Sequence, residues 1–247
     1  MPKILGIIPA RFQSTRLPGK PLLKIGEQTM IQRVYNQVIK CPLLENVLVA
    51  TDDQKIFDHV TSFQGNVVMT SEDHQSGTDR CFEALNNWGG EYDYVINIQG
   101  DEPFIVSDQI EILAKLLDGK TEIATLIKKI EDEKTLFNVN IPKVILNNYQ
   151  EAIYFSRQTI PYLREIETSN WLNHNVFYKH LGIYGYRVDI LDQITKLEQS
   201  TLELAEKLEQ LRWIENGYKI KVGISPYDSI GIDTLDDIEK ARKSISQ

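Results

Sequence analysis

The sequence contains too little cysteine for a disulfide framework or a thiolate metal cage. Its 247 residues include two cysteines, Cys41 and Cys81, which do not form a CxxC pair. Two widely separated thiols cannot supply either kind of scaffold, so we expect both to be reduced. The four histidines show neither HExxH nor H-x-H spacing, which argues against a zinc site.

Positive charge is also in short supply. Lys and Arg together number 27, against 35 Asp and Glu, and the formal net charge is -8. Nucleic-acid backbones are usually met by a basic face, so this balance argues against a nucleic-acid partner. Any contact with phosphate must therefore come from a local cluster of cations.

The sequence has no hydrophobic run of membrane-spanning length. The apolar N-terminal run Ile4–Ile8 is broken by Pro9 and Arg11, which leaves it too short for a signal peptide or a membrane span. We expect a cytoplasmic protein without a membrane partner.

The common nucleotide and nucleophile motifs are missing as well. A Walker A loop would need Gly where Ser14 stands and Ser or Thr where Pro21 stands. Neither the GxGxxG fingerprint nor a GxSxG elbow occurs. These absences argue against a P-loop enzyme, a dinucleotide-dependent oxidoreductase and a serine hydrolase.

The sequence does contain short apolar runs that alternate with amphipathic segments. A content of 42% hydrophobic and 25% charged residues is typical of a globular protein. One segment begins with Thr29 as a helix N-cap, followed by Gln32. The alternation predicts an α/β fold with a mainly parallel sheet and helices on both sides. The predicted N-terminal strands are Ile4–Pro9, Val47–Thr51, Val67–Thr70 and Tyr94–Ile98.

After about residue 120 the pattern changes to consecutive strands without an intervening helix. This predicts an antiparallel lobe at roughly residues 122–187 within a single domain of residues 1–247. A helix with Leu204, Leu208 and Leu211 on one packed face is expected next, opened by a capping box at Ser200 and Glu203. The remaining predictions are strands at 122–130, 143–146, 151–155, 180–186 and 218–224, and helices at 200–217 and 234–245.

The loop after the first predicted strand concentrates positive charge in an acidic protein. Arg11, Arg16 and Lys20 lie between Pro9 and Pro21 with no carboxylate among them. Such a cluster favours a pyrophosphate or triphosphate clamp, with a solvated basic loop as the alternative.

Carboxylates follow other strands. Asp101 lies directly after an apolar run, and Asp233 lies just before the closing helix. One or two carboxylates together with substrate phosphates satisfy Mg²⁺, although either residue could instead be a turn or cap residue. Asp52 and Asp53 are interpreted as helix caps rather than ligands.

Seven ordered motifs, which cover nearly the whole chain, resemble the CMP-Kdo synthetase family, the 3-deoxy-manno-octulosonate cytidylyltransferases. Many ordered motifs are far more specific than one glycine-rich loop. The motifs are 8–11 with 14–22, 50–53, 74–80, 99–103, 154–157, 180–184 and 208–212.

The resemblance implies a Rossmann-like nucleotidyltransferase fold, a three-layer sandwich whose smaller antiparallel lobe is used in forming a homodimer. It implies that CTP and Kdo react, with Mg²⁺ as cofactor, to give pyrophosphate and CMP-Kdo for lipopolysaccharide biosynthesis. The implied catalytic residues are Lys20, Arg16, Asp101 and Asp233, of which Asp101 and Asp233 hold the metal. The implied CTP-binding residues are Pro9, Ala10, Arg11, Arg16, Lys20, Thr51, Asp52, Ser76, Gly77, Thr78, Arg80 and Gln99. The implied sugar-acid-binding residues are Gln99, Arg157, His180, Tyr184, Glu209 and Gln210.

Two segments depart from the family pattern. Proline has moved in the stretch 138–144, and the stretch 227–231 looks closer to related enzymes that use 8-amino-Kdo, although His74 and Glu102 match the Kdo form. Alternatives to Kdo are therefore 8-amino-Kdo or another 2-keto sugar acid, such as a sialic acid. A non-catalytic nucleotide-binding module is the alternative of a different class.

Overall fold

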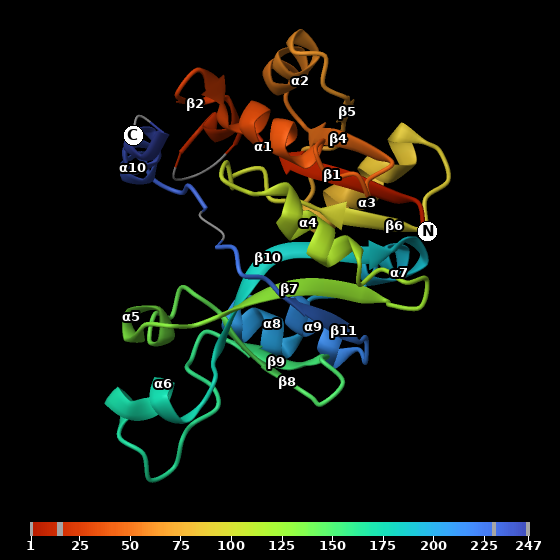
Figure 1. Ribbon diagram of the computed structural model, residues 1–247. Coiled ribbons are helices and arrows are strands. Elements are labelled where there is room, and N and C mark those ends of the chain that lie inside the picture. Colours follow the sequence, from red (N-terminus) through yellow and green to blue (C-terminus); the bar gives the residue numbers. More distant parts are fainter. Residues whose placement is uncertain (1, 14–16, 229–230, 246–247) are drawn as a thin grey trace.

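One nine-stranded sheet forms the centre of the molecule (Figure 1). The computed structural model describes residues 2–13, 17–228 and 231–245. The main path of the sheet runs β11-β7-β10-β6-β1-β4-β5, and β8 and β9 attach to it through β10. The strands of the main path are β1 (Ile4–Ala10), β4 (Asn46–Thr51), β5 (Val67–Met69), β6 (Tyr94–Asn97), β7 (Ile123–Lys129), β10 (Tyr178–Arg187) and β11 (Ile220–Ile224).

The sheet is parallel in its N-terminal half and mixed beyond it. The neighbours β6, β1, β4 and β5 are all parallel, as predicted, whereas β10 runs antiparallel to both β6 and β7. The carboxyl ends of β1, β4 and β6 therefore lie at one edge of the sheet, the edge at which open α/β proteins bind ligands. A small antiparallel ribbon of β2 (Lys24–Ile25) and β3 (Gln28–Thr29) lies outside the sheet.

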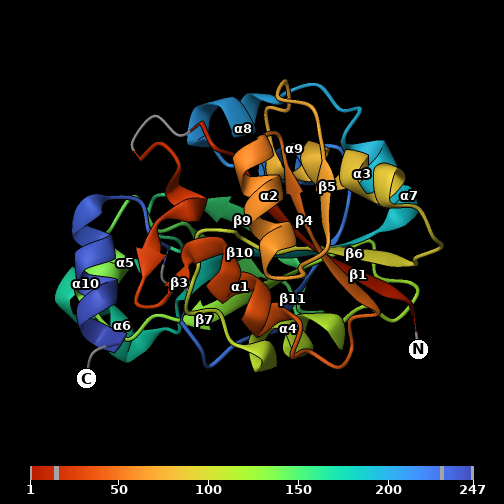
Figure 2. The same cartoon turned by 90° about the horizontal axis from the view of Figure 1, so that it is seen from above.

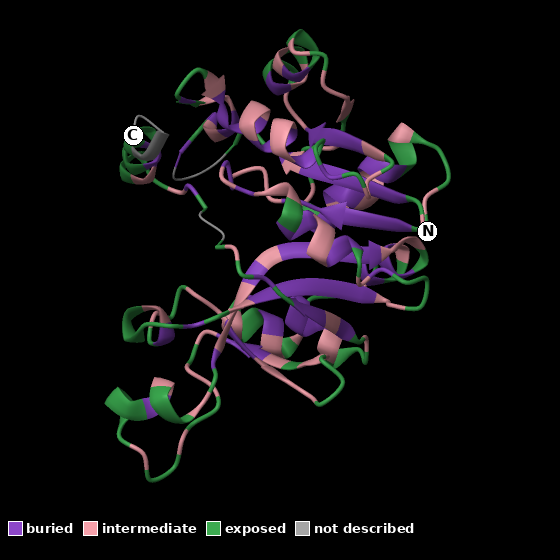
Figure 3. Cartoon of the chain, in the orientation of Figure 1, coloured by how far each residue is buried: buried purple, intermediate pink, exposed green. Residues whose placement is uncertain are grey.

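Helices cover both faces of the sheet (Figure 2). One core cluster contains Ile31, Val34 and Ile110, and the cluster on the other face contains Cys81 and Leu191. Figure 3 shows the strands between these helices as the most continuously buried part of the molecule. This arrangement confirms the predicted α/β class. The helices that line the two faces are α1 (Met30–Val38), α2 (Gln54–Ser62), α3 (Gly77–Trp88), α4 (Ser107–Ala114) and α7 (Val188–Ile194).

Side-chain caps set the starts of several helices. Thr29 accepts a hydrogen bond from the backbone N of Gln32 at 3.3 Å, which confirms the predicted cap of α1. Asp53 caps α2 by accepting from Lys55 N at 2.8 Å, as interpreted from the sequence. Thr234 and Asp237 form a reciprocal capping box before α10 (Leu235–Ile245).

The region predicted as an antiparallel lobe is partly built into the central sheet. Its first and last strands, β7 and β10, are central members, while a hairpin of β8 (Lys143–Leu146) and β9 (Ala152–Ser156) extends the sheet. The prediction that no helix intervenes after residue 130 was wrong, because Asp132 caps the short helix α5 (Glu133–Leu136). The lobe also contains η2 (Thr168–Asn170) and α6 (Trp171–His174).

The helix predicted over residues 200–217 was also wrong, because two short helices occupy this segment. Lys207 adopts a left-handed conformation (φ 53°, ψ 48°), which ends α8 (Thr201–Glu206) before α9 (Gln210–Glu215) begins. The predicted packed face is broken too: Leu208 and Leu211 are buried, but Leu204 on α8 is exposed. A buried bidentate ion pair, Arg212 to Glu203 at 2.6 and 2.8 Å, holds the two helices together.

Within residues 2–13, 17–228 and 231–245, no helix combines the length and the apolar character needed to cross a bilayer.

Candidate active site

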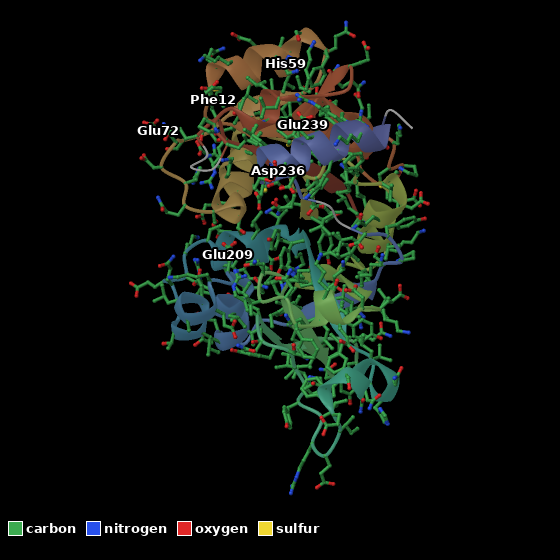
Figure 4. The ribbon with its side chains drawn as sticks, turned by 90° about the vertical axis from the view of Figure 1, so that its left-hand side faces the viewer. Phe12, His59, Glu72, Glu209, Asp236 and Glu239 are labelled. Atoms are coloured by element: carbon green, nitrogen blue, oxygen red, sulfur yellow. The ribbon has the colours of Figure 1, made fainter. Side chains whose placement is uncertain are left out.

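A cavity of about 270 Å³ opens at the carboxyl edge of the parallel strands. Its walls come from the loops after β1 and β6, the start of α3 and the segment before α10. Figure 4 shows Phe12, from the loop after β1, and Glu72, from the loop after β5, on the left-hand side of the view. Glu209 lies below them on the same side. The lining residues are Pro9, Ala10, Arg11, Lys20, Pro21, His74, Gln75, Ser76, Gly77, Arg80, Gln99, Gly100, Asp101 and Asp233.

Lys20 joins the two predicted metal carboxylates. The loop after β1 reverses at Gly19, whose φ of 68° suits glycine, and leads into the short helix η1 (Lys20–Leu22). The Lys20 ammonium donates to Asp101 Oδ2 at 2.7 Å and to Asp233 Oδ1 at 3.2 Å. A third bond goes to the carbonyl of Ile232 at 2.7 Å. The structure therefore brings together residues more than 200 positions apart.

The loop that carries Asp101 lies tightly against the end of β1. A Cβ added to Gly100 would lie 2.6 Å from the carbonyl oxygen of Pro9, so only glycine fits there without a backbone shift. The backbone N of Ile232 also donates to the carbonyl of Asp101 at 3.0 Å. These contacts fix Asp101 and the segment before α10 side by side.

The start of α3 forms the opposite wall. Ser76 caps the helix by accepting from Asp79 N at 3.1 Å, and Gly77 is exposed to the cavity. The twelve-residue helix therefore points its N-terminal dipole and free amides at the space that Lys20 and Arg11 also line. This wall can bind an anion.

Arg80 is the buried cation of the cavity. Its guanidinium donates to Asp52 Oδ2 at 2.7 Å and to the Thr70 hydroxyl at 2.6 Å. Asp52 and the fully buried Thr51 do not line the cavity. Asp52 therefore orients Arg80 from behind, a role that its interpretation as a cap did not anticipate.

A group of buried polar side chains lies beside the cavity, between α3, β10 and α9. Glu209 accepts a hydrogen bond from the Thr78 hydroxyl at 3.0 Å and connects α9 to α3. Burial raises the pKa of Glu209 above its usual range. Within the described part of the chain, Asn97 Oδ1, Gln210 Nε2 and Trp213 Nε1 are buried without a hydrogen-bond partner. Unpaired buried polar atoms are costly, which suits this group to a polar ligand.

The aromatic part of this group comes from β10. His180 packs against Tyr184 with ring centroids 5.2 Å apart, and Tyr184 packs edge-on against Trp213. Burial lowers the pKa of His180 to about 3, so the imidazole is neutral at physiological pH. Its Nε2 lies 3.0 Å from the Thr125 hydroxyl. Gln99 connects this side to the cavity by donating to the carbonyl of Gly182 at 2.8 Å.

Arg157 lies further out, at the corner between α8 and α9. Its side chain donates to backbone carbonyls of Glu206 at 2.6 Å, Lys207 at 3.3 Å and Val139 at 3.3 Å. Its guanidinium is thus engaged by the protein and is not among the groups that line the cavity.

Ten predicted site residues therefore line one cavity, and most of the others surround it. Arg16 lies outside the described residues. Those that line the cavity are Pro9, Ala10, Arg11, Lys20, Ser76, Gly77, Arg80, Gln99, Asp101 and Asp233. Those placed beside or behind it are Thr51, Asp52, Thr78, His180, Tyr184, Glu209 and Gln210, whereas Arg157 lies further out.

Sequence reasoning missed several contributors to the site. Asn97, the polar last residue of an otherwise apolar strand, could have been recognised by its position. His74 and Gln75 also line the cavity and belong to the motif 74–80 of the family resemblance, but neither was assigned a role in the site. The carbonyl of Ile232 could not have been found, because a backbone oxygen leaves no trace in a sequence.

The fold and the cationic cavity are those of a nucleotide-dependent transferase, and comparisons with known proteins define the class. A family model described as cytidylyltransferase matches residues 5–220, and the chain belongs to this family. The relatives are more specific. A protein of Cytophaga hutchinsonii named 3-deoxy-manno-octulosonate cytidylyltransferase is 57% identical over 95% of this chain and 94% of its own. One of the same name from Bacteroides thetaiotaomicron is 54% identical over 98% and 97%.

A solved structure supports the same family. A CMP:2-keto-3-deoxy-manno-octonic acid synthetase complexed with CTP superposes with a TM-score of 0.92 at 39% identity, covering 99% of each chain. These findings confirm the family resemblance and the nucleotidyltransferase-like fold.

Proposed function

We propose that this protein transfers CMP from CTP to the anomeric hydroxyl of Kdo and releases pyrophosphate. The observation that carries the proposal is the cavity itself, where cations and a helix N-terminus face two carboxylates next to a buried polar group. The names of its relatives and the CTP complex of a protein of the same fold support it. The product would be CMP-Kdo for lipopolysaccharide biosynthesis, made in the cytoplasm.

The cations of the cavity would hold the triphosphate. Arg11 is exposed and Lys20 is partly buried, so both can reach phosphate oxygens, while Arg80 is fixed by Asp52. The amides at the start of α3 supply neutral donors. Arg16, by the family resemblance, would complete the clamp. Because phosphoryl-type transfer needs mainly positioning and charge neutralisation, such a clamp on the departing pyrophosphate suffices without a covalent partner.

The two carboxylates fit a magnesium ion. Their oxygens and the Ile232 carbonyl already surround a cation, the Lys20 ammonium, and hard oxygen ligands are those that Mg²⁺ prefers. The described residues contain no cluster of three or more His, Cys, Asp or Glu groups suited to a metal, so the substrate phosphates would complete the ligand set. When bound there, the ion would neutralise phosphate charge and lower the pKa of the attacking hydroxyl.

The buried polar group would bind the sugar acid. Gln210 and Glu209 offer a donor and an acceptor to hydroxyl groups, and His180 and Tyr184 add two more polar groups on β10. Gln99 lies between this group and the phosphates. Arg157 would bind the sugar carboxylate only if its bonds to backbone carbonyls are exchanged. In the reaction, the anomeric oxygen would bond to the α-phosphorus, the bond to pyrophosphate would break, and Asp101 or a water held at the metal would accept the hydroxyl proton.

The protein would act as a homodimer. Among the residues whose exposure is described, six of the eleven exposed large hydrophobic side chains fall within residues 122–187. Their concentration in this segment supports an interaction surface there. The six are Phe137, Val139, Tyr149, Ile153, Tyr162 and Val176.

Pyrophosphate release by the purified protein tests the reaction. CTP, UTP and ATP would each be combined with Kdo, 8-amino-Kdo and N-acetylneuraminate, with Mg²⁺ or with EDTA. We expect release with CTP and Kdo in Mg²⁺ and none in EDTA. Release with a different sugar acid would move the specificity but keep the reaction. No release with any pair would favour a nucleotide-binding module without catalysis.

A further inference from the structure

The Lys20 ammonium has no hydrogen-bonding capacity to spare. It has three N–H donors, and three oxygens accept from it: Asp101 Oδ2 at 2.7 Å, the Ile232 carbonyl at 2.7 Å and Asp233 Oδ1 at 3.2 Å. The lysine side chain is 13% exposed, whereas those of Asp101 and Asp233 remain 34% and 46% exposed. The ammonium is thus held beneath carboxylates that the cavity can still reach.

We propose that Lys20 occupies the cation site of the nucleotide-free protein and excludes the divalent metal from it. The metal and the triphosphate then bind together, because the triphosphate draws Lys20 away from the carboxylates. This inference rests on the proposed function, since the excluded ion is the metal of the transfer reaction.

Charge and geometry both make the two cations competitors. Lys20, Asp101 and Asp233 sum to a single negative charge, so a divalent ion added beside the ammonium would leave the cluster positive. Mg²⁺ also needs its ligands at about 2.0–2.1 Å, closer than the three oxygens stand to Lys20 Nζ, so these same oxygens cannot hold both cations at once. A metal that uses them can bind only when the ammonium leaves.

The ammonium has a place to go when nucleotide arrives. Lys20 and Arg11 line the same cavity. The flexible four-carbon chain of a lysine lets its ammonium move within such a space. A triphosphate supplies more negative charge than the two carboxylates, so it favours the swing. By linkage, nucleotide must tighten metal binding by the same factor by which metal tightens nucleotide binding.

Binding of Mn²⁺ without nucleotide, followed by the EPR signal of the free ion, tests the proposal. We expect weak binding by the wild type and a dissociation constant about tenfold lower in Lys20→Met, within the range typical of coupled sites. The control is Arg11→Met, which removes a cation from the same cavity that no hydrogen bond joins to Asp101 or Asp233 in the described structure; it should bind Mn²⁺ as the wild type does. Adding Asp101→Asn to Lys20→Met should abolish the gain.

The proposal fails if Lys20→Met and the wild type bind Mn²⁺ equally, or if Arg11→Met tightens binding as much. Should Lys20→Met not fold, as judged by circular dichroism, Lys20→Gln tests the same point. With CTP added, the wild type should bind more Mn²⁺ than the Asp101→Asn protein does. The difference excludes Mn²⁺ that is held by the nucleotide alone. No sugar acid is present, so these outcomes are independent of pyrophosphate release, and either result can fail without the other.

Discussion

Asp101 lines the cavity and accepts a hydrogen bond from Lys20, the residue that we place at the phosphates. We expect Asp101→Asn to lower pyrophosphate release by at least about 10²–10³-fold, because it removes one of two negative charges from the cation site. The side chain is partly exposed and belongs to a loop, so the melting temperature should stay close to that of the wild type.

Asp58→Asn is the matched control, since Asp58 is exposed on α2 and bonds only the Gln54 amide among described residues. Both variants would be assayed with CTP and Kdo. Equal turnover in Asp101→Asn and the control would contradict the role assigned to Asp101.

His180 should stay neutral throughout the physiological range. Burial lowers its folded pKa to about 3 from 6.5, so the neutral form is favoured in the native state. The stability gained from that preference is complete above pH 6.5 and is lost as pH falls from 6.5 toward 3, at up to about 1.4 kcal/mol per pH unit.

Two measurements check the predicted neutrality of His180. The NMR signal of the His180 ring should not titrate between pH 8 and pH 5. The unfolding free energy of His180→Gln should decline less between pH 7 and pH 5 than that of the wild type. A midpoint near 6.5 in the folded protein would show that the imidazole is accessible to water.

At the scale of elements, the sequence allowed strands and helix starts to be predicted. It did not allow the break within the predicted helix 200–217 to be predicted. Apolar β-branched runs identify buried strands, and Thr29 was recognised as a cap because a cap acts within one turn. The break at Lys207 has no such local signal. No glycine or proline marks it, and the left-handed residue is held in place by tertiary contacts such as those of Arg157.

The same limit applies to the site. The loops that follow strands could be predicted to converge, because parallel strands end at one edge, and the charges on those loops suggested phosphate. Their pairings could not be predicted. That Asp52 supports Arg80, or that Thr78 meets Glu209, depends on residues 28 and 131 positions apart in sequence being brought together by the fold.

The junction of α8 and α9 should depend on its buried ion pair. Arg212→Met removes both bonds to Glu203 and leaves that carboxylate buried without its counter-charge, with only the bond from the Ser200 backbone N among the described contacts. We expect the unfolding free energy to fall by about 3–5 kcal/mol, as is typical when one partner of a buried pair is removed. Urea denaturation measures it.

Lys196→Met supplies the control. It breaks an exposed pair with Asp192 on the neighbouring helix and should cost less than about 1 kcal/mol. If the two variants were equally stable, the α8–α9 corner, and with it the placement of Glu209 and Gln210, would have to be held by other contacts.

At the scale of the whole molecule, the extension of residues 122–187 exposes apolar side chains that a lone chain would leave in water. Ile153 lies on β9, the outer strand of the hairpin, and the residue is 49% exposed. If this face joins two copies, Ile153→Lys should place a charge in the contact and shift the protein from dimer to monomer in sedimentation velocity.

Ile39→Lys is the control, because Ile39 is similarly exposed at 52% but lies at the end of α1. A monomeric wild type, or a dimer that Ile153→Lys leaves intact at micromolar concentration, would remove this face from consideration; a monomer that still releases pyrophosphate would show that each copy holds a complete site.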